Sequence, residues 1–183
     1  MDRRVCGIAI LFCLAVPVLG ACGLGGSQEQ AAATNRGGVP PIFPDASLHP
    51  GVANPDVTQD NISSTICKSG FTKTIRPPAS YTDKLERQQI SDEGLPGSPQ
   101  DYEEDHLISL ELGGAPKDEK NLWPEPYENR GARFAEPGTG SETKDKVENE
   151  TKRLVCSGKM TLSDAQERIA SDWRKLGKDE GAL

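Results

Sequence analysis

Two consecutive segments near the C-terminus carry apolar residues at helical spacing, and they constrain the fold more than any other feature. In residues 144–156, one helical face consists of Val147, Thr151, Leu154 and Val155. In residues 162–176, the corresponding face consists of Leu162, Ala165, Ile169 and Trp173. Thr161 and Asp164 have the spacing of a helix-capping pair at the start of the second segment. The sequence therefore predicts two amphipathic helices at this end of the chain.

The residues before these helices predict a small mixed structure. Residues 81–90 are typical of a short helix. In residues 105–112 every second residue from Ile108 to Leu112 is apolar, which is the period of a half-buried strand. A Gly-Gly loop follows, and residues 121–123 form a second short extended piece. The predicted order is strand, loop, strand, helix, helix, so the predicted class is α+β.

The N-terminus has the pattern of an export signal. A basic start, "MDRR", precedes a short apolar run that ends in small residues. Pro17 interrupts this run, which is too short for a convincing membrane-spanning helix. The stretch LGAC at residues 19–22 resembles the lipobox of bacterial lipoproteins. By that resemblance, Cys22 becomes the lipidated first residue of a protein anchored to a membrane of the cell envelope; the alternative is an ordinary secreted protein.

Composition divides the rest of the chain into a linker and a domain. Residues 22–61 are rich in Gly, Pro, Ala and Asn and have no sustained apolar period, so we expect a disordered linker after the signal at residues 1–21. His49 falls within it and is interpreted as a linker residue. The folded domain is expected over residues 62–177, followed by a tail at residues 178–183.

Two cysteines remain inside the predicted domain, Cys67 near its start and Cys156 near its end. Paired cysteines of an exported domain usually form a disulfide bond, because the compartment is oxidising. Closing a loop of about ninety residues in this way stabilises the fold by roughly 4 kcal/mol in the chain-entropy model. The alternative is two separate buried thiols.

The overall charge argues against a general nucleic-acid binder. The formal net charge is −7 at pH 7, so the chain lacks the basic field that attracts polyanions. Local contacts with phosphate could still come from a basic group near the first C-terminal helix: Lys144, Lys146, Lys152 and Arg153.

A histidine at the start of the predicted strand lies in a recognisable pattern. Asp105-His106, then Gly113-Gly114, then Asn121 resemble the HNH endonucleases of the His-Me finger superfamily. The likeness covers roughly residues 65 to 175, through three blocks that begin "CKSGFTKTIRPP", "EEDHLISLELGG" and "KDKVEN". It implies a small ββα-metal finger that holds one divalent ion, Mg²⁺ by preference with Mn²⁺ or Zn²⁺ as alternatives. It also implies a hydrolase of phosphodiester bonds in nucleic acid, with DNA the first choice and RNA the second. We expect the protein to be a monomer.

The chemistry of the pattern agrees with that activity. Hydrolysis of a phosphodiester needs water to lose a proton near neutral pH, and histidine is the side chain suited to accept it. A hard cation held by carboxylates stabilises the charge that develops on the phosphate. The resemblance makes His106 the general base, Asp105 a metal ligand and Asn121 the group that orients the imidazole.

The third letter of the HNH pattern has no histidine in this chain. Asp145 and Glu148 stand three residues apart on one predicted helical face, and we prefer them as further metal ligands. Asn129 is the alternative. The incomplete pattern and the acidic charge leave a second hypothesis open, a non-catalytic envelope lipoprotein that uses a degenerate HNH finger as a binding scaffold.

Overall fold

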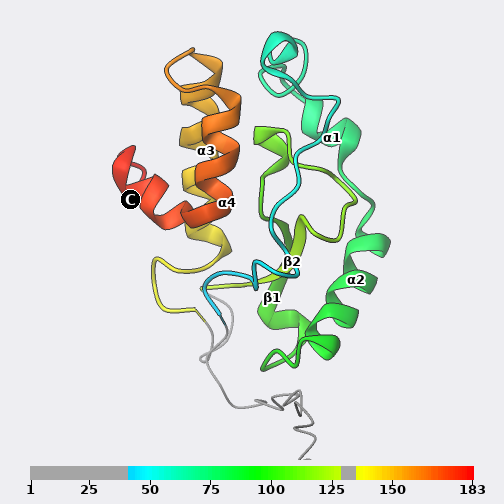
Figure 1. The fold of residues 1–183 in the computed structure, drawn as a ribbon. Coiled ribbons are helices and arrows are strands. Elements are labelled where there is room, and N and C mark those ends of the chain that lie inside the picture. The colour runs from blue at the N-terminus through cyan, green and yellow to red at the C-terminus, as the bar shows by residue number, and fades with distance from the viewer. Residues whose placement is uncertain (1–40, 129–134) are drawn as a thin grey trace, which may run out of the picture. The chain divides into compact units, whose positions relative to one another are not determined.

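The computed structural model describes residues 41–128 and 135–183, drawn in colour in Figure 1. Its helices and strands follow in this order: α1 (Phe71–Ile75), α2 (Ala79–Asp92), β1 (Tyr102–His106), β2 (Leu122–Pro126), α3 (Ser141–Cys156) and α4 (Leu162–Asp179). Short 3-10 turns occur at Gln59–Asn61, Pro99–Asp101 and Leu110–Leu112. Helices combined with a small antiparallel sheet confirm the α+β class. The ββα-metal finger itself stays a prediction.

The sheet consists of β1 and β2, paired so that Tyr102 faces Pro126 and His106 faces Leu122. The predicted strand over residues 105–112 is therefore wrong in its position, because β1 starts three residues earlier and ends at His106. The reason is burial: Leu107 to Leu110 are all at most 5% exposed, and so is Leu112. A segment covered on every side needs no alternation, and here it turns through Leu110–Leu112 instead of extending.

α3 and α4 lie side by side as an antiparallel pair that carries most of the core (Figure 1). The predicted apolar faces are confirmed, since every residue assigned to them from the sequence is at most 8% exposed. The hydroxyl of Thr161 accepts a hydrogen bond from the backbone N–H of Asp164 at 3.1 Å, so the predicted cap is present. Ile108 and Leu112 from the segment after β1 join this core.

α2 packs against both strands of the sheet (Figure 1). Gln89 of α2 donates a side-chain hydrogen bond to the carbonyl of Leu122 in β2 at 3.0 Å. The helix begins at Ala79, slightly before the predicted start, because Pro77-Pro78 hold the chain extended up to that point. α2 therefore covers the two-stranded sheet and is tied to it by this bond.

The chain from residue 41 to residue 61 is part of the domain, so the predicted linker is wrong for this stretch. Val57 is 5% exposed and belongs to the core, and Phe43 lies against Trp173 with ring centroids 6.1 Å apart. His49 is 4% exposed and bonds to Glu93. A few apolar anchors and backbone hydrogen bonds to the loop after β1 are sufficient to order a Gly- and Pro-rich segment that lacks apolar periodicity. Residues 22–40 lie outside the described residues.

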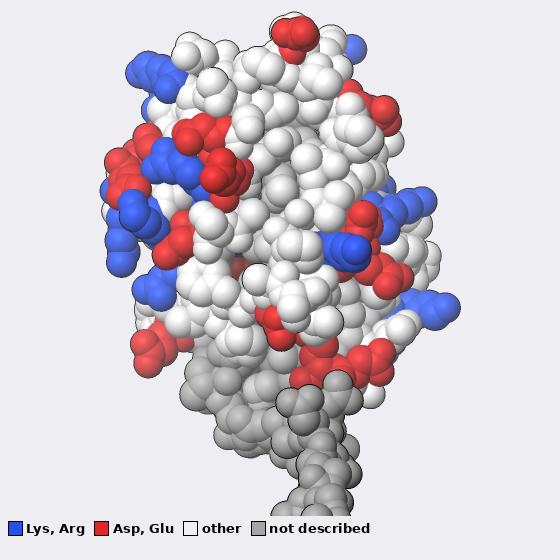
Figure 2. Space-filling model, in the orientation of Figure 1, with Lys and Arg blue, Asp and Glu red and all other residues white. Residues whose placement is uncertain are grey.

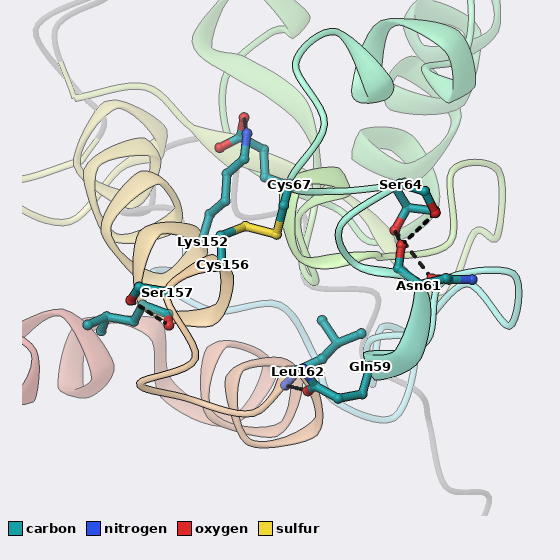
Figure 3. The surroundings of a disulfide bond; sticks show 11 residues. Gln59, Asn61, Ser64, Cys67, Lys152, Cys156, Ser157 and Leu162 are labelled. Carbon is teal, nitrogen blue, oxygen red and sulfur yellow. Dashed lines mark hydrogen bonds and ion pairs between the residues drawn. A yellow bond between two sulfur atoms is a disulfide. The ribbon is translucent and has the colours of Figure 1, made fainter.

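Cys67 and Cys156 form a disulfide bond, with their Cα atoms 5.6 Å apart and 89 positions apart in sequence. Figure 3 shows that it joins the last turn of α3 to the loop that follows the 3-10 turn at Gln59–Asn61. Nearby, the Gln59 side-chain oxygen accepts a hydrogen bond from the backbone N–H of Leu162 at 2.7 Å. These contacts fasten the N-terminal part of the domain to the helical pair.

The C-terminal end is more ordered than a tail. α4 continues to Asp179 and contains a kink at Asp172. Beyond it, the backbone N–H groups of Ala182 and Leu183 both bond to the carbonyl of Gly177. No helix within the described residues has the length and apolar character needed to cross a membrane. The predicted signal and Cys22 lie outside the described residues.

Candidate active site

The loop between β1 and β2 is organised around the buried amide of Asn121. Its side-chain oxygen accepts from the backbone N–H groups of Ile108 at 2.9 Å and Val52 at 3.2 Å. Its side-chain nitrogen donates to the carbonyls of Ile108 and Ala115, both at 3.0 Å. An amide has two donors and an acceptor oxygen with two lone pairs, so this side chain is fully engaged. These four bonds hold backbone segments together, and the role of Asn121 in orienting the imidazole stays a prediction.

The two glycines of the motif are required by the same loop. Gly113 has a φ of +71°, a left-handed conformation that side chains disfavour. A Cβ on Gly114 would lie 1.7 Å from the carbonyl oxygen of Ile108 and 2.8 Å from the Asn121 side-chain nitrogen. The motif therefore encodes a tight turn that closes onto Asn121.

His106 ends β1, with its imidazole enclosed under this loop. The residue is 3% exposed, and its Nε2 lies 3.1 Å from the carbonyl oxygen of Pro116. Because that oxygen can only accept, Nε2 carries the hydrogen, and Nδ1 of the neutral ring keeps its lone pair. Burial lowers the pKa of His106 below its usual value, although Asp105 opposes the effect. The imidazole is accordingly neutral at neutral pH.

On the other face of β1, acidic side chains surround the ammonium of Lys144 from α3. This Nζ atom donates to Oδ2 of Asp105 at 2.5 Å, to the His106 carbonyl at 3.0 Å, and to Oε1 of Glu148. Oε2 of Glu125, from β2, lies 3.7 Å away. The side chain of Lys144 is 0% exposed, and all three of its N–H donors are used. We call Lys144, Asp105, Glu125 and Glu148 the Lys144 cluster.

Charges inside the Lys144 cluster are nearly balanced. Burial alone would raise the pKa of Asp105, but the positive charge of Lys144 lowers it to about 2. Burial raises the pKa of Glu148 to about 7, with partial opposition from Lys144. Glu125 is completely buried, which raises its pKa well above the usual value and keeps it neutral. Near pH 7 the cluster therefore holds a cation, a full anion and a partly ionised glutamate.

The predicted metal ligands are only partly brought together. Asp105 and Glu148 meet at Lys144, whereas Asp145 is exposed on α3, so a joint ligand role for Asp145 and Glu148 stays a prediction. Asn129 lies outside the described residues. Within residues 41–128 and 135–183, no group of three or more His, Cys, Asp or Glu side chains is arranged to hold a metal ion.

Sequence reasoning missed Lys144, Glu125 and Ser109 as members of this site. The hydroxyl of Ser109 donates to Oε2 of Glu148 at 2.7 Å. A signal for Lys144 was present, because it stands four residues before Glu148 and next to the apolar face of α3. Nothing in the sequence around Glu125, between two prolines, indicates burial of a carboxyl group.

A second group of carboxyls lies on the α2 side of the sheet. Both side-chain oxygens of Glu104 are enclosed without a hydrogen-bond partner among the described residues. Burial raises the pKa of Glu104 to about 9, and the nearby charge of Glu86 adds to the effect. Burial also raises the pKa of Glu86 to about 7. Glu104 is therefore neutral near pH 7.

The surface has no continuous basic region on the face that Figure 2 shows, where Lys and Arg are interspersed with Asp and Glu. The basic residues expected to contact phosphate are largely engaged within the domain. Lys144 is buried, Lys152 pairs with Glu111 at 2.8 Å, and Arg153 pairs with Glu150 at 2.5 Å.

Comparison of the chain with protein-family models, with curated proteins and with solved structures finds no match.

Proposed function

We propose that this protein is an HNH-type endonuclease that hydrolyses phosphodiester bonds of DNA, or alternatively of RNA, with His106 as general base. The observation that carries the proposal is the bond from His106 Nε2 to the carbonyl of Pro116. It selects the tautomer whose Nδ1 has a free lone pair, and burial keeps the ring neutral. This is the form of histidine that removes a proton from water.

The proposed reaction follows from that proton transfer. Nδ1 takes a proton from water, and the resulting hydroxide attacks phosphorus. The bond from phosphorus to the leaving oxygen breaks, and that oxygen receives a proton from solvent or from the imidazolium. Asn121 contributes indirectly, because its bonds to Ile108 fix the backbone two residues after the base.

The divalent ion implied by the resemblance has a chemically suitable set of oxygens in Asp105, Glu125 and Glu148. It does not fit among them as they are arranged, because the ammonium of Lys144 occupies the space between them. The proposed chemistry therefore rests on His106, and a metal requirement is tested directly below.

The burial of this site favours a second candidate, a non-catalytic scaffold. His106 is 3% exposed, so a phosphodiester reaches Nδ1 only after neighbouring residues move. A saturated Lys144 cluster also stabilises a fold without any need for catalysis. A scaffold of this kind binds its partner and does not turn it over.

A cleavage assay separates the two candidates. Purified protein is incubated with supercoiled plasmid or with RNA, in Mg²⁺, Mn²⁺ or chelator. The endonuclease predicts nicking by wild type and a loss of about 10²–10⁴ in rate for His106→Ala, with helical content unchanged. The control is His49→Ala, which removes the other histidine of the chain and should retain activity at temperatures where it is folded. Absence of cleavage by wild type under every condition supports the scaffold, and equal cleavage by His106→Ala refutes the assigned base.

We further propose that the protein is anchored to a membrane of the bacterial envelope through lipid on Cys22, as the residue 19–22 pattern indicates. Cys22→Ala should abolish labelling by a fatty-acid probe and release the protein from the membrane fraction. A variant that keeps both properties contradicts the anchor.

A further inference from the structure

Arg76 follows α1 directly, and its side chain has no acidic partner among the described residues. It is exposed and forms neither an ion pair nor a side-chain hydrogen bond with them. Arg153, by contrast, pairs with Glu150 at 2.5 Å. A guanidinium group has five N–H donors in a planar fork, so the side chain of Arg76 is available to an anionic ligand.

The chain holds Arg76 beside the loop that encloses His106. Two prolines follow Arg76 and lead directly into α2, so its backbone is extended and has little freedom. From α2, the hydroxyl of Tyr81 donates to the carbonyl of Lys117 at 3.0 Å. Lys117 follows Pro116, whose carbonyl oxygen accepts the hydrogen bond from His106. These contacts place the start of α2 next to the proposed base.

The charges that act on His106 include that of Arg76. Burial lowers the pKa of His106, and the positive charges of Arg76 and Lys144 lower it further, against the opposing effect of Asp105. Lys144 is enclosed by its carboxyl partners, whereas Arg76 is open to solvent. The start of α2 adds positive potential, because no side chain caps it and its first turn has no acidic residue. An anion that approaches His106 therefore meets an exposed cation.

We propose that Arg76 binds the phosphodiester group that is cleaved and holds it next to His106. The inference rests on the proposed function and deepens it, because it names the residue through which the same site takes its substrate. Two parallel N–H bonds from a guanidinium group fix the orientation of a phosphate. Lys144, for which the sequence predicted a phosphate contact, is buried and leaves this role open.

The decisive variant is Arg76→Gln, which removes the charge and keeps a polar side chain. Fluorescence anisotropy with a labelled DNA duplex measures binding in chelator at several salt concentrations, and gel analysis checks that the duplex stays intact. We expect Arg76→Gln to bind about tenfold more weakly than wild type at low salt. The slope of log affinity against log salt should fall by about one, because one phosphate contact is lost. Arg76→Lys should recover part of the affinity, since it restores the charge without the planar fork.

Arg87→Gln is the matched control. Arg87 is another exposed arginine without an ion pair among the described residues, and its charge acts on Glu86 of the same helix. This variant should bind and cleave as wild type does. In the cleavage assay, Arg76→Gln should lower kcat/KM by about 10²-fold, because the reacting phosphate loses a fixed positive charge. Its Tm should match that of wild type, because only the backbone N–H of Arg76 takes part in ending α1.

The outcomes that overturn the inference are distinct. If Arg76→Gln binds the duplex as tightly as wild type, or if Arg87→Gln shares the loss equally, Arg76 makes no specific phosphate contact. Wild-type protein that binds no duplex has the same consequence. Weaker binding with an unchanged kcat/KM would show that Arg76 contacts a phosphate other than the reacting one. Failure of the proposed function has a different signature: no variant cleaves, yet Arg76→Gln still binds the duplex more weakly than wild type.

Discussion

Asn121 binds both backbone groups of Ile108, accepting from its N–H at 2.9 Å and donating to its carbonyl at 3.0 Å. β1 has no neighbouring strand beyond His106, and the Asn121 amide supplies the backbone hydrogen bonds that such a strand would make. The backbone N–H of Leu107 adds a bond to the Asn121 carbonyl at 2.8 Å, which continues the pairing past the end of the strand. One side chain therefore fixes the path of the chain directly after the proposed base.

Replacing Asn121 should lower the unfolding free energy of the domain. Asn121→Ala leaves buried backbone groups of Val52, Ile108 and Ala115 without partners, so we expect a loss of about 3 kcal/mol in unfolding free energy. Urea denaturation followed by circular dichroism measures it. Asn149→Ala, an exposed asparagine on α3, is the control and should change stability by less than about 0.5 kcal/mol. Equal stability of the two variants would show that the Asn121 bonds are dispensable.

The sequence predicted the parts of this domain whose pattern is local. The buried faces of α3 and α4 are visible in the spacing of Val147 through Trp173, because a helix packed on one side repeats every 3.6 residues. The Cys67–Cys156 bond was also predictable, because the predicted domain contains only these two cysteines and the pattern of an export signal leads one to expect an oxidising compartment. These features depend on residue type and spacing alone.

Features that depend on distant contacts were not predictable in the same way. The order of residues 41–61 comes from contacts such as His49 with Glu93 and Phe43 with Trp173, which are separated widely in sequence. Lys144 was interpreted as a possible phosphate contact, and only the approach of β1 and β2 explains its burial. A buried lysine is recognisable when its partners are known, and those partners lie on other elements.

Loss of the disulfide bond should weaken the domain considerably. The double variant Cys67→Ser/Cys156→Ser restores the chain entropy of a long loop in the unfolded state, so we expect a loss of roughly 4 kcal/mol. Chemical denaturation with and without reductant provides the test. Reductant should lower the stability of wild type by a similar amount and leave the double variant unchanged. A wild-type protein insensitive to reductant would contradict the contribution assigned to this bond.

The contact between His49 and Glu93 should make stability depend on pH. Burial alone would lower the pKa of His49, but its hydrogen bond to Glu93 and the charge of that carboxylate raise the pKa above 6.5. The folded state therefore favours protonated His49. This stabilisation is complete below pH 6.5 and is lost as the pH rises through the folded-state pKa.

Denaturation of wild type and His49→Gln from about pH 5 to about pH 9 tests this dependence. We expect the wild-type advantage to be about 1.5 kcal/mol at the acidic end and to narrow as the pH rises. Glu93→Gln should reduce the same dependence, because it removes the carboxylate that favours the charged ring. A constant difference across the range would show that His49 titrates identically in the folded and unfolded states.

The final prediction concerns the energetic coupling of Lys144 with Asp105, measured in chelator so that no divalent ion replaces the ammonium. Lys144→Met alone leaves buried carboxyl groups without their cation, and we expect a cost of about 3–5 kcal/mol. Adding Asp105→Asn removes the strongest acid of the cluster and should recover part of that loss, with a coupling energy of about 2 kcal/mol.

The Lys152–Glu111 pair is the matched control for this coupling. It also joins a lysine of α3 to a carboxylate on another segment, the turn at Leu110–Leu112, but both side chains are at least one quarter exposed. Water screens such a pair, so Lys152→Met combined with Glu111→Gln should show a coupling below about 1 kcal/mol. If the Lys144–Asp105 coupling is no larger than that of the control pair, water reaches the ammonium of Lys144 in solution. The Lys144 cluster would then be exposed to solvent. The burial that distinguishes Lys144 from the other lysines of α3 would be absent in solution.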